Sequence, residues 1–336
     1  MALQRAVVFP GQGVEGGEIS GRVAEVVKEQ VGEEVPYQLS VFAASVTLFE
    51  RLRYAGVEAD VVAGHSLGEY GAAYAAGALG LDDAVRLVAE RDRLMMRCSR
   101  EKPGGMTAVV GADPAEVSEA VDEALAVGPV VAANFNTPRQ TVISGDKRAV
   151  DDAAGRLGGR KFELEVAGAF HSPLMMDASQ EMDRLLSETE FTEPRISMVS
   201  ATDGSVMESA ADIRDALRSQ MLSPVRWTTV VERLADLGVE EIIEAGDTGT
   251  LVRMLRDFKQ FKFDSAKATE ALSLPALFIK GEVDGVTRQE SFAPVPKKFD
   301  GPFEMIGLPG VGHFPTREAP GQVVDLLIPF LNGERP

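Results

Sequence analysis

The chain has 336 residues, of which 45 % are hydrophobic and 26 % are charged. This length accommodates two or three domains, and the composition is that of an ordinary globular protein. Lysine and arginine number 34 against 52 aspartate and glutamate residues, so the formal net charge is −18. Such an acidic chain is not expected to bind nucleic acid or an anionic membrane surface.

The cysteine, histidine and apolar content indicates whether disulfides, metal sites or membrane segments are to be expected. Cys98 is the single cysteine, which excludes an internal disulfide and suits a reducing compartment, so the expected location is the cytoplasm. With so few thiol and imidazole ligands we expect no metal site, and we expect no bound cofactor. The sequence has neither a signal-peptide pattern nor an apolar run of about 18 residues, so we expect no targeting or membrane-spanning segment.

The first predicted elements are a strand, a turn and two helices. Residues 5–9 are predicted to form a buried strand, and Pro10-Gly11-Gln12-Gly13 is its turn. Glycine on each side of Gln12 lets the backbone approach a ligand closely, although a simple strand-ending turn explains the same residues. Apolar periodicity predicts helices at residues 38–52 and, more weakly, at 19–30.

Residues 61–70, VVAGHSLGEY, combine a short apolar run, a glycine-flanked serine and the start of an alanine-rich helical pattern. This strand–turn–helix order is typical of a nucleophile elbow, in which Gly64 and Gly68 permit a turn too tight for a Cβ. Such a turn exposes Ser66 Oγ and makes the Leu67 N–H a natural oxyanion donor. A glycine-flanked turn without chemistry is the alternative. A further helix is predicted at residues 82–98.

Residues 105–167 have a different pattern from the segments around them. Strands are predicted at 106–110, 130–134, 140–144 and 161–166, and helices at 115–126 and 146–157. Asn136-Thr137-Pro138 is predicted to be the turn between the middle strands. The order βαββαβ is ferredoxin-like and compact enough for an inserted domain. His171 follows directly, where the chain re-enters the large domain, and such junctions are favoured ligand sites.

The alternation of strands and helices resumes after residue 177. Strands are predicted at 196–200 and 241–244, with helices at 213–221 and 227–237 and others on each side. This alternation predicts a mainly parallel α/β sheet.

Six ordered motifs stand out along this part of the chain. They are FPGQG at 9–13, GHSLGEY at 64–70, RLVAERDRLM at 86–95, ANFNTPRQTVISG at 133–145, GAFHSPLM at 168–175 and SPVRWTTVVERLADLGVEEIIEAG at 223–246. They resemble the malonyl-CoA:acyl-carrier-protein transacylases over about residues 5–258. The resemblance implies an α/β-hydrolase-like large domain (1–104 and 168–260) and an inserted ferredoxin-like small domain (105–167). Residues 261–336 lie outside it and are expected to form an α/β-hydrolase-like C-terminal extension.

The resemblance also implies roles for single residues. Ser66 matches the acyl-accepting serine nucleophile of the family, and His171 matches its base. The backbone amides of Gln12 and Leu67 match the oxyanion donors. A serine is a poor nucleophile at its own pKa, so an imidazole must take its proton and return it to the leaving thiolate. His171 as a structural histidine is the alternative, and His65 is expected to pack behind the elbow.

Three further residues are expected to select the acyl group. Arg91 matches the arginine that holds the free carboxylate of malonyl, which a planar guanidinium grips bidentately. The alternative is an arginine paired with neighbouring charges on an exposed helix face. Phe170 resembles the form associated with malonyl rather than methylmalonyl selection, and Met95 is expected to line the acyl pocket; both could equally be apolar core.

The implied activity is a ping-pong acyl transfer in fatty-acid or polyketide synthesis. Malonyl-CoA is the expected substrate and an acidic acyl-carrier protein the expected partner. The basic residues expected to meet that carrier, unless they are ordinary solvated charge, are Arg97, Arg100, Lys102, Arg139, Lys147 and Arg148. An acyl-thioester hydrolase that clears carrier proteins is the alternative function, and a non-catalytic scaffold is a third.

The chain departs from the family pattern in three places. The segment between Gly13 and Gln38 is shorter than usual, so a more open entrance is expected. Gly246-Asp247-Thr248-Gly249 replaces the usual Gly-Pro-Gly, in a loop that offers the carbonyl that orients the histidine in the family, so the sequence leaves open which loop orients His171. Third, the tail from about residue 261 resembles the end of an α/β-hydrolase, with strands at 274–280 and 303–308 and a helix at 322–331.

Asp284 and His313 match the acid and the histidine of that hydrolase end. No second G-x-S-x-G accompanies them. The tail is therefore a graft that extends the large domain, a separate lobe, or the source of an alternative acid–base pair for Ser66. The last case would favour attack by water on the acyl-enzyme.

Overall fold

The computed structural model describes residues 4–14, 16–246, 249–258, 276–282, 303–312 and 314–331. The chain forms two compact units, residues 1–50 with 58–260 and residues 51–57 with 261–336. Within the described ranges, no helix combines the length and the apolar character needed to cross a bilayer.

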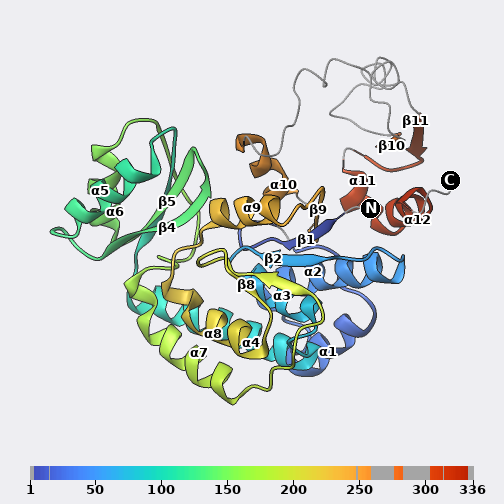
Figure 1. Cartoon of the computed structure of the whole chain (residues 1–336), viewed down its shortest axis with the longest axis horizontal. Helices are drawn as coiled ribbons and strands as arrows, with labels where there is room; N and C mark the ends of the chain where they lie inside the picture. The colour runs from blue at the N-terminus through green and yellow to red at the C-terminus, as the bar shows by residue number, and fades with distance from the viewer. Residues whose placement is uncertain are drawn as a thin grey trace. The chain divides into compact units, whose positions relative to one another are not determined.

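A five-stranded sheet in the order β8-β7-β2-β1-β9 forms the centre of the first unit (Figure 1). Its strands are β1 (Arg5–Phe9), β2 (Val61–Gly64), β7 (Ser197–Val199), β8 (Val206–Met207) and β9 (Glu241–Glu244). Only β8 runs antiparallel to its neighbour. The middle strands β1 and β2 are almost wholly buried, which explains their continuous apolar runs, since helices cover both faces of such a sheet.

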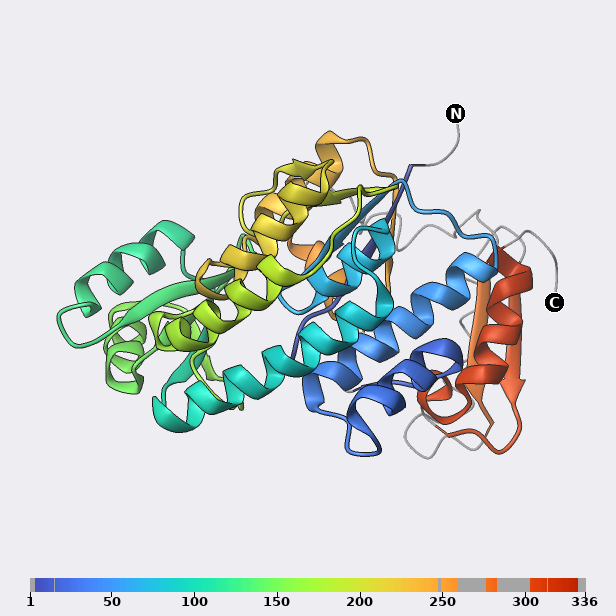
Figure 2. The ribbon, with the colours of Figure 1, turned by 90° about the horizontal axis from the view of Figure 1, so that it is seen from below.

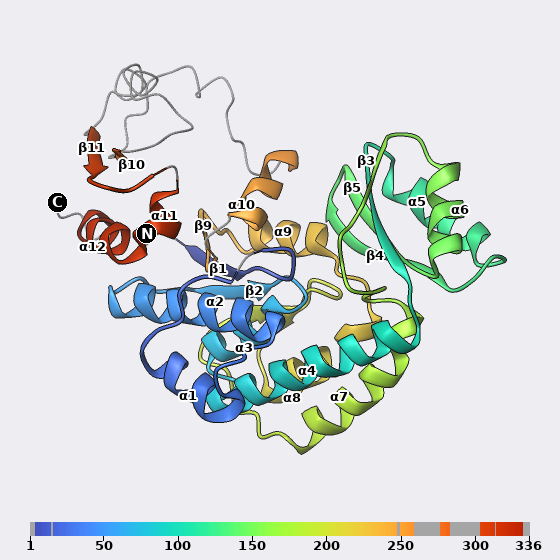
Figure 3. The same ribbon diagram turned by 180° about the vertical axis from the view of Figure 1, so that it is seen from behind.

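The helices of this part of the chain are α1 (Gly21–Val31), α2 (Tyr37–Tyr54), α3 (Gly68–Ala76), α4 (Leu81–Glu101), α7 (Met176–Glu188), α8 (Ala210–Ser219), α9 (Trp227–Asp236) and α10 (Thr250–Met254). Three short 3₁₀ helices join them: η1 (Pro173–Met175), η2 (Gln220–Leu222) and η3 (Leu255–Asp257). Figures 1 and 3 show α3 and α9 on opposite faces of the sheet.

Helix α4 is amphipathic, and its buried stripe contains one charged residue. Its buried residues recur at three- and four-residue spacing, and Arg91 lies among them. Asp82 and Asp83 in the first turn and Arg100 in the last turn complement the helix dipole. Figure 2 shows α4 alongside α7, against which it packs. The only charged side chain of the stripe is therefore held inside the fold.

Residues 105–163 form a four-stranded antiparallel sheet in the order β4-β5-β3-β6. Its elements are β3 (Gly105–Val110), α5 (Pro114–Ala124), β4 (Val130–Thr137), β5 (Gln140–Gly145), α6 (Lys147–Arg156) and β6 (Arg160–Glu163). Asp113 closes a capping box at α5, and Asp146 caps α6. This βαββαβ order, beside the parallel sheet, confirms the predicted fold class.

Two predicted bounds of the small sheet are wrong. The strand expected at 130–134 continues through Asn136 to Thr137, so the turn that follows is shorter than predicted. Irregular pairing with β5 after Ala132 lets β4 bend and continue. The strand expected at 161–166 ends at Glu163, with all four of its residues exposed.

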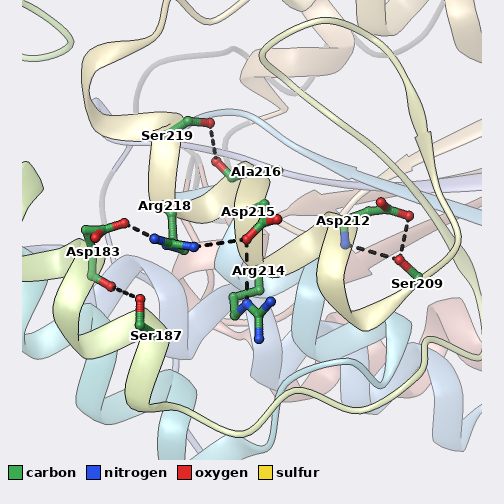
Figure 4. Close-up of polar contacts among 9 residues, drawn as sticks. All are labelled: Asp183, Ser187, Ser209, Asp212, Arg214, Asp215, Ala216, Arg218 and Ser219. Atoms are coloured by element: carbon green, nitrogen blue, oxygen red, sulfur yellow. Dashed lines mark hydrogen bonds and ion pairs between the residues drawn. The ribbon is translucent and has the colours of Figure 1, made fainter.

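Helices α7 and α8 pack together under a network of surface charges. Figure 4 shows Arg218 between two carboxylates, with its Nε 2.6 Å from Asp183 and its Nη1 3.3 Å from Asp215. Ser209 caps α8 by accepting a hydrogen bond from the Asp212 N–H. Helix α8 runs directly into η2.

The described part of the second unit contains the parallel strands β10 (Ala276–Gly281) and β11 (Phe303–Leu308) and the helices α11 (Pro315–Glu318) and α12 (Pro320–Leu331). Both strands and the longer helix overlap the predicted ones. A small apolar cluster of Leu308, Val311, Ala319 and Val323 holds β11 to the helices. Asp284 and His313 lie outside the described residues.

Candidate active site

The turn at Ser66 is as tight as its sequence predicted. Ser66 has φ 53°, a left-handed conformation between the end of β2 and the start of α3. A Cβ on Gly64 would lie 2.1 Å from the Gly68 carbonyl carbon, and a Cβ on Gly68 would lie 2.1 Å from the Phe9 carbonyl oxygen. Only glycine fits at both positions, so the sequence builds the elbow from sterics alone.

The structure brings His171 to this turn. Ser66 Oγ lies 2.7 Å from His171 Nε2. On the other side of the ring, Nδ1 lies 3.2 Å from the Gln220 carbonyl oxygen and 3.0 Å from that of Ser223. Both carbonyls can only accept, so Nδ1 carries the proton and Nε2 is left to accept the Ser66 hydroxyl.

These carbonyls come from η2 and the residue after it, Gln220 and Ser223. Asp247 and Thr248 of the loop after β9 lie outside the described residues. His171 itself has φ 61°, so its backbone is also left-handed. The ring is thus oriented by the segment that follows α8.

His171 is neutral at physiological pH. Burial lowers its pKa to about 3, and the charge of Arg91 and the nearby His65 ring lower it in the same direction. A neutral imidazole that faces a serine hydroxyl can take its proton, which makes the hydroxyl a nucleophile.

Arg91 lies within the core, where its side chain is 0 % exposed. Its Nη2 donates to Ser66 Oγ at 3.2 Å and, at 3.4 Å, to Gln220 Oε1, while its Nη1 donates to Gln38 Oε1. Among the described residues the Nε–H has no hydrogen-bond partner, and burial lowers the pKa of the guanidinium. In the described part of the chain, no carboxylate forms an ion pair with it. The interpretation of Arg91 as an exposed, ion-paired helix residue is therefore wrong.

Two residues that the sequence analysis missed link these groups. The Glu69 carboxylate accepts hydrogen bonds from the Ala201 N–H at 3.0 Å and from Gln220 Nε2 at 2.6 Å. The same Nε2 donates to the Ser66 carbonyl at 2.9 Å. Glu69 lies in GHSLGEY, where a carboxylate on an otherwise apolar helix was a usable signal. Gln220 carries no comparable signal, because a neutral amide fits no catalytic pattern.

Burial also raises the pKa of Glu69 to about 7, although its hydrogen bonds and the Arg91 charge oppose the shift. The carboxyl group is thus poised to gain a proton near neutral pH. Its two donors keep it beside the backbone of Ser66 in either state.

A cavity of about 310 Å³ opens beside Ser66. Gln12, Phe170 and His171 line it, together with the rest of the loop after β1. Leu67 is 1 % exposed at the start of α3. Met95 is equally buried, and its sulfur accepts a hydrogen bond from Gln38 Nε2 at 3.4 Å. Met95 therefore touches the residue that holds Arg91 and does not line this cavity.

His65 is packed rather than free. Its Nε2 lies 2.9 Å from Asn136 Oδ1, and its ring lies 5.6 Å from that of Trp227. Asn136 donates its own amide to Gln140, so Nε2 of His65 is the donor to Asn136. This contact joins the elbow to β4 of the small sheet.

The residues that the structure describes contain no cluster of three histidine, cysteine, aspartate or glutamate side chains able to hold a metal ion.

Comparison with known proteins identifies the family of this chain. Residues 20–279 match the acyl transferase domain family. The malonyl CoA-acyl carrier protein transacylase of Salmonella typhimurium is 38 % identical over 224 residues, which cover 65 % of this chain and 72 % of that protein. The polyketide synthase GfsB of Streptomyces halstedii is 38 % identical over 229 residues, 67 % of this chain and 4 % of that protein.

Solved structures agree with these sequence matches. The malonyl-CoA:acyl carrier protein transacylase of Xanthomonas oryzae superposes on this chain with a TM-score of 0.70 and is 34 % identical to it. The match covers 76 % of this chain and 92 % of the Xanthomonas chain. A malonyl-transacylase in complex with a type II polyketide-synthase acyl-carrier protein gives a TM-score of 0.69 at 30 % identity, with 76 % and 93 % covered. The chain belongs to the acyl transferase domain family, and it is an acyltransferase.

Proposed function

We propose that this enzyme moves a malonyl group from CoA to the phosphopantetheine thiol of an acyl-carrier protein, through an ester on Ser66. The observation that carries the proposal is Arg91, a buried cation 3.2 Å from Ser66 Oγ with no carboxylate partner in the described chain. A buried charge without a counter-ion is costly, and the free carboxylate of malonyl would supply one. The names of the relatives support the same substrate.

In the first half-reaction, Ser66 Oγ attacks the thioester carbonyl while its proton passes to His171 Nε2. The negative charge that develops on the carbonyl oxygen is stabilised by the backbone N–H groups of Leu67 and Gln12, each worth a few kcal/mol. The carbon–sulfur bond then breaks. The CoA thiolate leaves with the proton from His171, and malonyl remains on Ser66.

The second half-reaction reverses these steps with a new thiol. The pantetheine thiol gives its proton to His171, and its sulfur attacks the Ser66 ester carbonyl. The ester bond breaks, and the proton returns to Ser66 Oγ. Malonyl leaves as a carrier-bound thioester, so neither half-reaction consumes water.

Arg91 would hold malonyl by one edge of its guanidinium. Gln38 already occupies Nη1, whereas Nε has no hydrogen-bond partner in the described part of the chain and Nη2 donates to Ser66. A carboxylate gripped on the Nε–Nη2 edge would lie next to the ester that Ser66 forms. Phe170, which lines the cavity, would limit the size of the acyl group there, and Met95 would act only by packing against Gln38.

We propose that the acidic carrier protein docks on those predicted basic residues whose charge is not neutralised by a close ion pair. Lys102 pairs with Asp177, and Lys147 pairs with Asp151, whereas the side chain of Arg148 is 83 % exposed and makes only a long ion pair, 3.8 Å, with Asp146. Arg148 is therefore the first residue to reverse in a docking test. We also propose that residues 105–167 are a separate small domain, that no cofactor is required and that the enzyme works in the cytoplasm.

Mass spectrometry after brief incubation with malonyl-CoA tests the proposal. We expect one malonyl group on Ser66, its absence in Ser66→Ala, and its transfer to added holo-carrier protein. Free malonic acid released at the same rate with and without carrier would instead identify a thioester hydrolase. Absence of label on wild-type Ser66 would overturn both activities.

A further inference from the structure

Tyr37, the first residue of α2, ties down the loop that follows β1. The Gly13 N–H donates to Tyr37 Oη at 3.0 Å, and the Tyr37 hydroxyl donates to the Val14 carbonyl at 2.8 Å. One phenol thus acts as acceptor and donor for two consecutive residues of the loop. We call this pair of hydrogen bonds the Tyr37 tie.

The other end of the same loop is held by the elbow. The His65 N–H donates to the Phe9 carbonyl at 2.9 Å. A Cβ on Gly11 would lie 2.6 Å from the His65 carbonyl oxygen, so the Gly11 backbone lies directly against the elbow. Gln12 lies between these contacts and the Tyr37 tie, and it lines the same cavity as Ser66.

Packing holds Val14, which is 7 % exposed in the apolar core, but it does not hold Gly13 itself. Gly13 has φ 92°, and apart from its chain neighbours no described atom lies within 4 Å of the position that a Cβ would take there. Glycine has more accessible backbone conformations than any other residue, so fixing it costs the most conformational entropy. A hydrogen bond from outside the loop is therefore needed to hold Gly13 in one conformation. The Tyr37 tie provides that constraint next to Gln12.

We propose that Tyr37 is a positioning residue that holds the Gln12 N–H against the developing oxyanion. The inference rests on the proposed function, in which this N–H is the second oxyanion donor. An oxyanion donor acts only as charge develops on the substrate. Loss of the tie therefore slows the chemical step, and it leaves the binding of malonyl-CoA unchanged.

The position of Tyr37 allows an effect on the chemical step to be measured separately from an effect on malonyl-CoA binding. Its side chain is 46 % exposed, so Tyr37→Phe removes the hydroxyl without opening the core. The next residue, Gln38, donates through its N–H to Asp92 and accepts from Arg91. A displaced α2 would disturb Arg91 and weaken malonyl-CoA binding, whereas a loosened Gln12 would not.

Ser40→Ala is a matched control on the same helical turn. Ser40 Oγ donates to the Tyr37 carbonyl at 2.8 Å, so this variant loses one hydroxyl bond to Tyr37 but keeps the tie. Rapid-quench acylation of Ser66 at several malonyl-CoA concentrations should show a limiting rate about tenfold lower in Tyr37→Phe, since misplaced donors are costly. The half-saturating concentration should stay within about twofold of wild type, and Ser40→Ala should match wild type in both.

Amide hydrogen exchange at Gly13 tests the tie without any activity. Exchange should be slow in wild type and Ser40→Ala and at least about tenfold faster in Tyr37→Phe, because the N–H loses its acceptor. Tyr37→Phe that acylates at the wild-type limiting rate, or that loses rate only through a raised half-saturating concentration, overturns the inference. Wild-type enzyme that takes no malonyl on Ser66 overturns the proposed function instead.

Discussion

Two arginine–carboxylate groups in this enzyme show opposite uses of charge. At the surface, Arg218 donates to Asp183 between α7 and α8, with both side chains more than a third exposed (Figure 4). In the core, Arg91 and Glu69 lie close enough to influence each other's pKa, yet each is hydrogen-bonded to neutral groups. The surface pair is complete by itself, whereas the buried arginine forms no ion pair with a carboxylate among the described residues.

The pKa values of the two carboxyl groups, Asp183 and Glu69, are shifted in opposite directions. The hydrogen bond from Arg218 lowers the pKa of Asp183, while burial raises that of Glu69 to about 7. Solvent screening makes the surface pair worth little, and desolvation makes the buried group costly. Unfavourable burial of charge therefore marks the site, and well-formed ion pairs do not.

Arg91→Ala should have the largest effect of the variants that test this contrast. We expect kcat/KM for malonyl transfer to fall about 10³-fold, since truncating a buried charged partner costs about 4 kcal/mol. Acetyl-CoA, which has no second carboxylate, should be used at least as well as by wild type. Arg91→Lys keeps the charge without the fork, so its loss should be intermediate. Equal losses for both substrates would refute the assigned role.

Glu69 should make stability depend on pH. Its folded pKa of about 7 lies above the ordinary 4.5, so its contribution is complete below pH 4.5 and is lost as the pH rises through 7. The loss relative to Glu69→Gln should reach about 3 kcal/mol. Urea unfolding of both proteins at pH 4.5 and pH 8 measures it. Identical pH dependence in the two proteins would show that Glu69 stays ionised.

Arg218→Ala should change little. We expect the free energy of unfolding to fall only slightly at low salt and by still less at 1 M salt, where exposed charges are screened. Acylation of Ser66 should stay within about twofold of wild type. A large loss of acylation would mean that the α7–α8 network sets the position of Gln220, and the contrast between the two groups would then fail.

The smallest expected effect is in the pH profile of acylation. His171 is neutral well below pH 5 because its pKa lies near 3, so kcat/KM should vary less than about twofold between pH 5 and pH 8. Stopped-flow acylation of wild type and Glu69→Gln would separate the two titrations. A midpoint near 6.5 in both proteins would contradict the low pKa of His171.

Much of the fold and the nucleophile could be predicted because local sterics fix them. The strand Arg5–Phe9 matches its prediction, and Gly64 and Gly68 alone require the turn at Ser66. The partners of these groups could not be predicted. Gln38 and Gln220 reach Arg91 from positions 53 and 129 residues away, and a neutral amide has no periodicity that announces a hydrogen bond. The domain bounds and residue roles inferred from the family stay predictions.

The left-handed backbone at both Ser66 and His171 has a consequence for engineering. Each conformation costs a non-glycine residue about 1–2 kcal/mol, and glycine would relieve that cost at position 66. Selection of a random library for heat resistance alone would therefore enrich dead enzymes with glycine at position 66. A thermostable version of this acyltransferase has to be sought with Ser66 and His171 excluded from mutagenesis.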